Sequence, residues 1–158
     1  MKKRNATSPT LDVMQGLWAF AHALEARSKR MHRDIGVTGP QRLVLMVIAE
    51  APGASPGEVA RHLRLNPGTV SRLVTALERA KLVRRGEHSL DGRKQRLVLT
   101  PRGETLAAQP RGTIEGAVRA ALASAAHGEA RQARRFLERL TEALAVPETG
   151  PRRRAARG

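Results

Sequence analysis

The sequence predicts a mainly helical protein with one small β-hairpin, and two observations carry this prediction. Apolar residues recur every three or four positions in several separate stretches, which is the spacing of amphipathic helices. Two short strand-like runs, Leu82–Arg85 and Gln95–Leu99, flank a polar stretch that contains the turn signal Asp91-Gly92. We therefore expect helices on both sides of a hairpin with a long tip.

The first two predicted helices are separated by a glycine. The first runs from Leu11 to about Met31, carries cations in its last turns, where the helix dipole favours them, and is broken by Gly36. The second begins at Thr38-Gly39-Pro40-Gln41, which has the Thr and Gln of a capping box and a proline in the first turn. It is almost wholly apolar from Leu43 to Ala49, so we expect it to be buried on most sides.

Two short helices follow, joined by a tight turn. Ser55 and Glu58 form a second capping box, and the helix that they start runs to about Leu63. Asn66-Pro67 is another cap with a proline behind it, so the connection through Arg64-Leu65 must be short. The helix from Asn66 to Ala80 has an apolar stripe and a polar face. The stripe holds Val70, Leu73, Val74 and Leu77, and the polar face holds Thr69, Ser71, Arg72, Thr75 and Arg79.

Further helices close the chain. Thr100-Pro101 starts one that Pro110 should kink or interrupt, and the last helix spans about residues 129–145. We expect a single domain over residues 11–146, a disordered arm at 1–10 and a disordered basic tail at 147–158.

Charge and composition restrict the partners. The chain has 29 Lys and Arg against 14 Asp and Glu, a net charge of +15, which predicts a polyanionic partner. Eleven Lys and Arg against three acidic residues fall between Arg61 and Arg102, so the basic footprint coincides with the paired helices and the hairpin. An aromatic content of 2% disfavours a membrane surface and stacked single-stranded RNA. Duplex DNA is the expected partner.

Several classes of protein are disfavoured by what the sequence lacks. Without cysteine there is no disulfide scaffold and no thiolate zinc site, and the five histidines show no spacing typical of metal ligands. No Gly-rich phosphate loop or nucleophile-and-base set is recognisable, so we expect neither an enzyme, nor a cofactor, nor a metal. The basic Met1–Arg4 is followed by polar residues instead of an apolar export signal, and a cytoplasmic location is expected.

The order helix, tight turn, helix and basic hairpin over residues 38–100 is typical of a winged helix-turn-helix, whose second helix enters the major groove. Here that helix is the one from Asn66 to Ala80, which we call the reading helix. Asn66 and Gly68 permit close approach of backbone to a phosphate at the start of the reading helix. Arg72 is the best candidate for a guanine edge, and the hydroxyls of its face are candidates for bases or phosphates. The candidate residues on this helix are Asn66, Gly68, Thr69, Ser71, Arg72 and Thr75.

The hairpin tip supplies a second candidate contact. Arg93 suits a narrow minor groove, Asp91 can orient its guanidinium, and Lys94 adds charge. Such a contact would respond to DNA shape more than to single bases.

Three segments together resemble the MarR family of regulators: Gly57–Val83, the Asp91-Gly92-Arg93 triplet and Thr100-Pro101-Arg102-Gly103. The resemblance, with its order of six helices, covers about residues 11–146. It implies a winged helix-turn-helix flanked by dimerisation helices at 11–34 and 101–146. It also implies a homodimer that binds a palindromic operator. Members of the family commonly repress transcription until a small molecule binds between the dimerisation and DNA-binding parts. Two departures from the family are Arg64-Leu65, where a glycine is often found, and Pro110, which interrupts the long fifth helix.

The sequence supports binding of a small-molecule effector less strongly than it supports DNA binding. Trp18 and His22, one helical turn apart, are candidates to border an effector pocket with Met46, although core or interface packing is the favoured interpretation. A second hypothesis is a constitutive or architectural DNA-binding protein with no effector, which the scarcity of aromatic residues favours.

Overall fold

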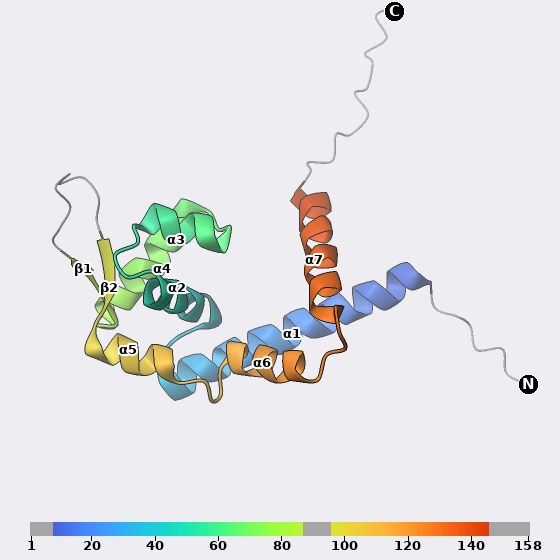
Figure 1. Cartoon of the computed structure of the whole chain (residues 1–158), viewed down its shortest axis with the longest axis horizontal. Coiled ribbons are helices and arrows are strands. Elements are labelled where there is room, and N and C mark those ends of the chain that lie inside the picture. Colours follow the sequence, from blue (N-terminus) through green and yellow to red (C-terminus); the bar gives the residue numbers. More distant parts are fainter. Residues whose placement is uncertain (1–7, 87–95, 146–158) are drawn as a thin grey trace, which may run out of the picture. The chain divides into compact units, whose positions relative to one another are not determined.

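The computed structural model describes residues 8–86 and 96–145 (Figure 1). It divides into two compact units, residues 1–117 and 118–158, which are described separately. The predicted mainly helical fold with one hairpin is confirmed. In chain order the described elements are α1 (Pro9–Ile35), α2 (Gly39–Glu50), α3 (Pro56–Leu63), α4 (Pro67–Arg79), β1 (Val83–Gly86), β2 (Arg96–Leu99), α5 (Pro101–Ala108), α6 (Ile114–Ala123) and α7 (Glu129–Ala145).

The predicted helix starts are confirmed at the level of single hydrogen bonds. Thr38 and Ser55 each form a full capping box, with Gln41 and Glu58 respectively. The Thr100 hydroxyl accepts from the Gly103 amide at 3.1 Å, and Asn66 caps α4. The helix α1 begins earlier than expected because Ser8 caps it, and it ends at Gly36, whose φ of 78° places it in the left-handed region that glycine tolerates.

The core of the first unit is formed by α2, α3, α4 and the hairpin, which Figure 1 shows gathered together. Its fully buried side chains include Val44, Leu45, Ile48, Val59, Val70, Val74, Leu77 and Leu97. The stripe predicted for the reading helix therefore faces the core.

The expectation that α2 is buried on most sides is confirmed, since Val44, Leu45, Val47 and Ile48 are buried, and one side is open to solvent. Leu43 is 47% exposed, whereas the neighbouring Arg42 is only 2% exposed. The reason is that Arg42 lies against backbone carbonyls at the end of α5, which require a hydrogen-bond donor that leucine lacks.

The hairpin is an antiparallel pair in which Val83 faces Leu99 and Gly86 faces Arg96. The segment before α3 is attached to it: the Gly53 amide donates to the Leu97 carbonyl at 2.9 Å, and the Leu97 amide donates to the Ala54 carbonyl at 3.0 Å. These bonds tie the start of the paired helices to the base of the hairpin.

The predicted interruption at Pro110 is confirmed. The helix that begins at Pro101 ends at Ala108, and α6 begins at Ile114, so the described residues hold seven helices instead of the six expected. In the second unit α7 has the predicted bounds and no buried residue. No helix in residues 8–86 and 96–145 is long and apolar enough to span a membrane.

Candidate nucleic-acid interface

The turn between α3 and α4 is as tight as the sequence predicts. Arg64 ends α3 with φ 54° and ψ 39°, a left-handed conformation, and the Leu65 amide donates to the Ala60 carbonyl at 2.9 Å. Asn66 then starts α4 directly. The turn therefore requires a left-handed backbone conformation at Arg64, which is the conformation that usually selects glycine at such a position.

At the start of α4, Asn66 and Gly68 are both exposed, and the Asn66 side chain accepts from the Gly68 amide at 2.8 Å. The Thr69 amide is also engaged, since it donates to the Asn66 carbonyl at 3.0 Å. An anion at this end would thus be attracted by the helix dipole and by nearby cations more than by those two amides.

The outward face of α4 carries the predicted polar residues. Ser71 and Arg72 are exposed, and one Arg72 guanidinium nitrogen lies 3.4 Å from the Thr69 hydroxyl, to which it donates. Thr75 is half-buried and its hydroxyl donates to the Ser71 carbonyl at 3.0 Å. Among the candidates on this helix, Arg72 therefore has the long, exposed donor side chain that can reach a base. The Thr75 hydroxyl, in contrast, already donates to a backbone carbonyl of its own helix.

The base of the hairpin adds cations that sequence reasoning did not single out. Arg84 and Arg85 on β1 are exposed, and Arg85 forms a two-point contact with Glu78 of α4 at 2.7 and 3.1 Å. This hydrogen bond with Glu78 raises the pKa of Arg85 further above its ordinary value. The pair links β1 to the reading helix. Asp91, Arg93 and Lys94 lie outside the described residues.

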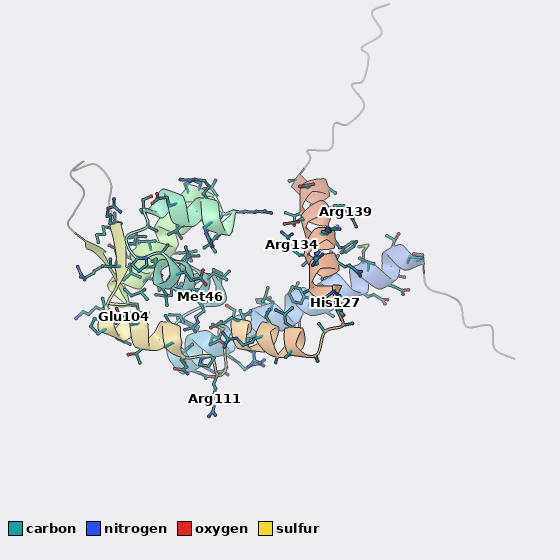
Figure 2. The ribbon with its side chains drawn as sticks, viewed as in Figure 1. Met46, Glu104, Arg111, His127, Arg134 and Arg139 are labelled. Carbon is teal, nitrogen blue, oxygen red and sulfur yellow. The ribbon has the colours of Figure 1, made fainter. Side chains whose placement is uncertain are left out.

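None of the candidate pocket residues lines the cavity beside α5. Trp18 is 70% exposed on α1, His22 is exposed on the same helix, and Met46 is half-buried on α2, where Figure 2 labels it. A cavity of about 470 Å³ lies instead between the end of α2, the hairpin and α5. Its lining is mostly apolar and includes Ile48, Pro52, Val98 and Leu99, with Arg84 and Glu104 as its charged members. No cluster of three metal-ligating side chains occurs in the described part of the chain.

Comparisons with known proteins agree with one another. The sequence profile of the MarR family matches residues 35–94. The HTH-type transcriptional repressor Rv2887 of Mycobacterium tuberculosis is 31% identical over 106 residues, which cover 67% of this chain and 76% of that protein. The crystal structure of the M. tuberculosis MarR family protein Rv2887 aligns with a TM-score of 0.55 at 26% identity, covering 86% of this chain and 97% of that chain.

A second solved structure is similar in fold. The crystal structure of the S. aureus MepR–DNA complex aligns with a TM-score of 0.65 at 20% identity, covering 81% of this chain and 94% of that chain. The likeness extends well beyond the paired helices and the hairpin.

Proposed function

The chain belongs to the MarR family of HTH-type transcriptional regulators, and from this premise we propose that it is a sequence-specific repressor that binds a palindromic operator as a homodimer. It is a DNA-binding regulator and not an enzyme. We propose a cytoplasmic location for it, as expected of a protein that acts on DNA.

One observation carries the proposal: α4 buries Val70, Val74 and Leu77 completely and presents Arg72 to solvent on the opposite face. A helix that is held by its apolar stripe across a tight turn can enter the major groove as a rigid unit. The MepR structure, which has the same fold, is a complex with DNA. We assign base reading to Arg72, and phosphate or base contacts to Asn66, Gly68, Thr69 and Ser71. Thr75 joins them only as an acceptor, because its hydroxyl proton is donated to the Ser71 carbonyl. Arg93 and Lys94 are proposed as the wing contact, with Asp91 as its support.

Exposed apolar side chains support the proposed homodimer. On α1, Leu11, Val13, Met14, Trp18 and Phe20 are exposed, and on α7 so are Phe136, Leu137 and Leu144. Exposed apolar area on this scale favours association, and two copies related by a two-fold axis would match a palindrome.

Release by a small molecule is a weaker proposal. Trp18, His22 and Met46 remain candidates for an effector pocket, and the cavity beside α5 supplies a second location. The alternative is a regulator that binds DNA constitutively. A thermal-shift screen with aromatic acids separates the two, because a ligand of the folded state raises the melting temperature and should also release the operator.

Selection of bound sequences from random duplexes tests the proposal. We expect a palindrome whose half-sites lie about one helical turn apart, since two reading helices must enter successive major grooves on one face. Enrichment of a single asymmetric site, or no enrichment over input, would overturn the proposed dimeric repressor.

A further inference from the structure

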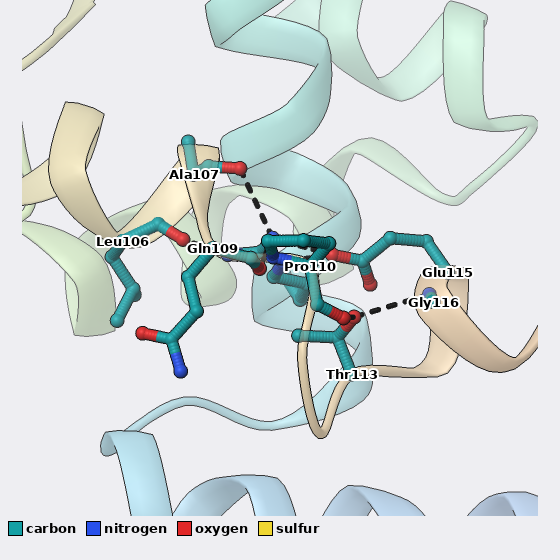
Figure 3. A network of polar contacts seen from close by, with 8 residues as sticks. Leu106, Ala107, Gln109, Pro110, Thr113, Glu115 and Gly116 are labelled. Atoms are coloured by element: carbon teal, nitrogen blue, oxygen red, sulfur yellow. Dashed lines mark hydrogen bonds and ion pairs between the residues drawn. The ribbon is translucent and has the colours of Figure 1, made fainter.

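The buried Arg42 of α2 holds the corner between α5 and α6. Its Nε donates to Glu115 Oε1 at 2.6 Å, and one terminal nitrogen donates to the carbonyls of Ala107 at 3.0 Å and Gln109 at 2.6 Å. The other terminal nitrogen donates to the Leu106 carbonyl. Figure 3 shows these carbonyls and the Glu115 carboxylate converging from the end of α5 and the first turn of α6.

Local contacts around Pro110 stabilise the corner between α5 and α6. Thr113 is buried, and its hydroxyl donates to the Pro110 carbonyl at 2.6 Å and accepts from the Gly116 amide at 3.1 Å, which caps α6 (Figure 3). A Cβ on Gly116 would collide with the Pro110 carbonyl oxygen. The interruption is thus a packed element whose polar groups are satisfied, and not a frayed end.

A second position of α2, about one helical turn earlier, lies against both α1 and the first residue of α6. The Gly39 amide donates to the Ser28 hydroxyl of α1 at 2.8 Å, and a Cβ on Gly39 would lie 2.6 Å from the Cδ1 of Ile114. Residues 39 and 42 share one face of a helix. That face of α2 therefore receives both the end of α5 and the beginning of α6.

We propose that Arg42 is a positioning residue for operator recognition, which sets the spacing between half-sites by holding the end of α5 and the first turn of α6 against α2. The inference rests on the proposed two-fold dimer. Helix α2 packs against α4, the helix proposed above to read DNA, so the corner that Arg42 holds is joined to the reading helix through α2. Directional bonds to several backbone carbonyls and one carboxylate allow one orientation of this corner, whereas an apolar side chain of similar length would tolerate several.

The test compares wild type with Arg42→Met on duplexes that carry the selected half-sites at systematically varied separation. We expect the variant to keep the half-site sequence and its affinity for a single half-site, while its preference for the wild-type separation falls about tenfold, a typical coupling between distant sites. The matched control is Arg33→Met, because Arg33 is exposed at the end of α1 and contributes the same charge.

Each outcome decides the inference. A folded Arg42→Met with the wild-type spacing profile overturns it and leaves the repressor proposal intact. Should wild type show no paired half-sites, the repressor proposal itself fails, and the inference with it. If Arg42→Met does not fold, Glu115→Gln takes its place: it keeps the α5 carbonyl contacts and weakens only the hold on α6. An unchanged spacing profile in folded Glu115→Gln then overturns the inference, and a broadened profile supports it.

Discussion

Arg64 adopts a backbone conformation that is sterically disfavoured for a residue with a side chain. Its φ of 54° lies in the left-handed region, where a residue with a Cβ is disfavoured by about 1–2 kcal/mol relative to glycine. The turn between α3 and α4 requires this conformation, since the Leu65 amide reaches back to Ala60. Glycine would adopt this left-handed conformation with less strain.

We therefore expect Arg64→Gly to raise the free energy of unfolding by roughly 1 kcal/mol. Urea denaturation followed by circular dichroism measures it. Arg61→Gly is the matched control: Arg61 is exposed in the last turn of α3, so glycine there should lower stability by about 1 kcal/mol. A loss of stability in Arg64→Gly would show that contacts of the arginine side chain outweigh the backbone strain.

At the scale of single elements, the starts of α2, α3, α4 and α5 were predictable because each one is encoded within four residues, whereas the Ser8 cap of α1 and the start of α6 were not predicted. The side chains of Thr38, Ser55, Asn66 and Thr100 each meet an amide two or three positions later. Helix ends at Gly36 and before Pro110 follow from equally local rules. The tight turn and the exposed face of the reading helix were predictable for the same reason.

The contacts of Arg42 could not be predicted in this way. Its partners Leu106 and Glu115 lie 64 and 73 residues away in the chain, and no local pattern links them. An arginine in the first turn of a mainly apolar helix is ordinarily exposed, so nothing in the sequence marked Arg42 as buried. The ion pair between Arg85 and Glu78 was not predicted either, because its partners belong to a strand and a helix and no periodic pattern relates the two.

The start of α5 depends on a close approach between two backbones. Thr100 donates its hydroxyl proton to the Lys81 carbonyl at 2.7 Å, and a Cβ on Gly103 would collide with the Leu82 carbonyl oxygen. This explains the glycine in Thr100-Pro101-Arg102-Gly103: any larger residue would push α5 away from the start of the hairpin.

Gly103→Ala should therefore lower the free energy of unfolding by about 1–3 kcal/mol, the usual cost of overpacking a buried contact. Thermal and urea unfolding report the change. The control is Gly57→Ala in α3, where a Cβ meets nothing within 4 Å and alanine should stabilise the helix. Equal effects of the two substitutions would contradict the close approach of α5 to Leu82.

At the scale of the whole molecule, the exposed apolar side chains of α1 and α7 are the main evidence for association. Trp18, the single tryptophan of the chain, is 70% exposed in one copy, so it also serves as a reporter. A homodimer joined through α1 should bury its indole and shift its emission to shorter wavelength as concentration rises.

We expect a dimer at micromolar concentration by sedimentation, and we expect Trp18→Asp to weaken it by roughly tenfold or more, because buried aromatic anchors often contribute about 2 kcal/mol. Trp18→Phe keeps an apolar ring and should stay dimeric. A wild-type monomer at this concentration would exclude two-fold reading of a palindrome. A dimer that Trp18→Asp leaves unchanged would place the interface elsewhere.

The central claim is that the exposed face of α4 reads the operator, and Arg72 tests it most directly. Binding of wild type and Arg72→Ala to a panel of single-base variants of the selected duplex should show that the substitution costs about 1–3 kcal/mol and relaxes the preference at one base pair of each half-site. Arg79→Ala, in the last turn of the same helix, should leave every preference in place. An unchanged base preference in Arg72→Ala would contradict the assignment.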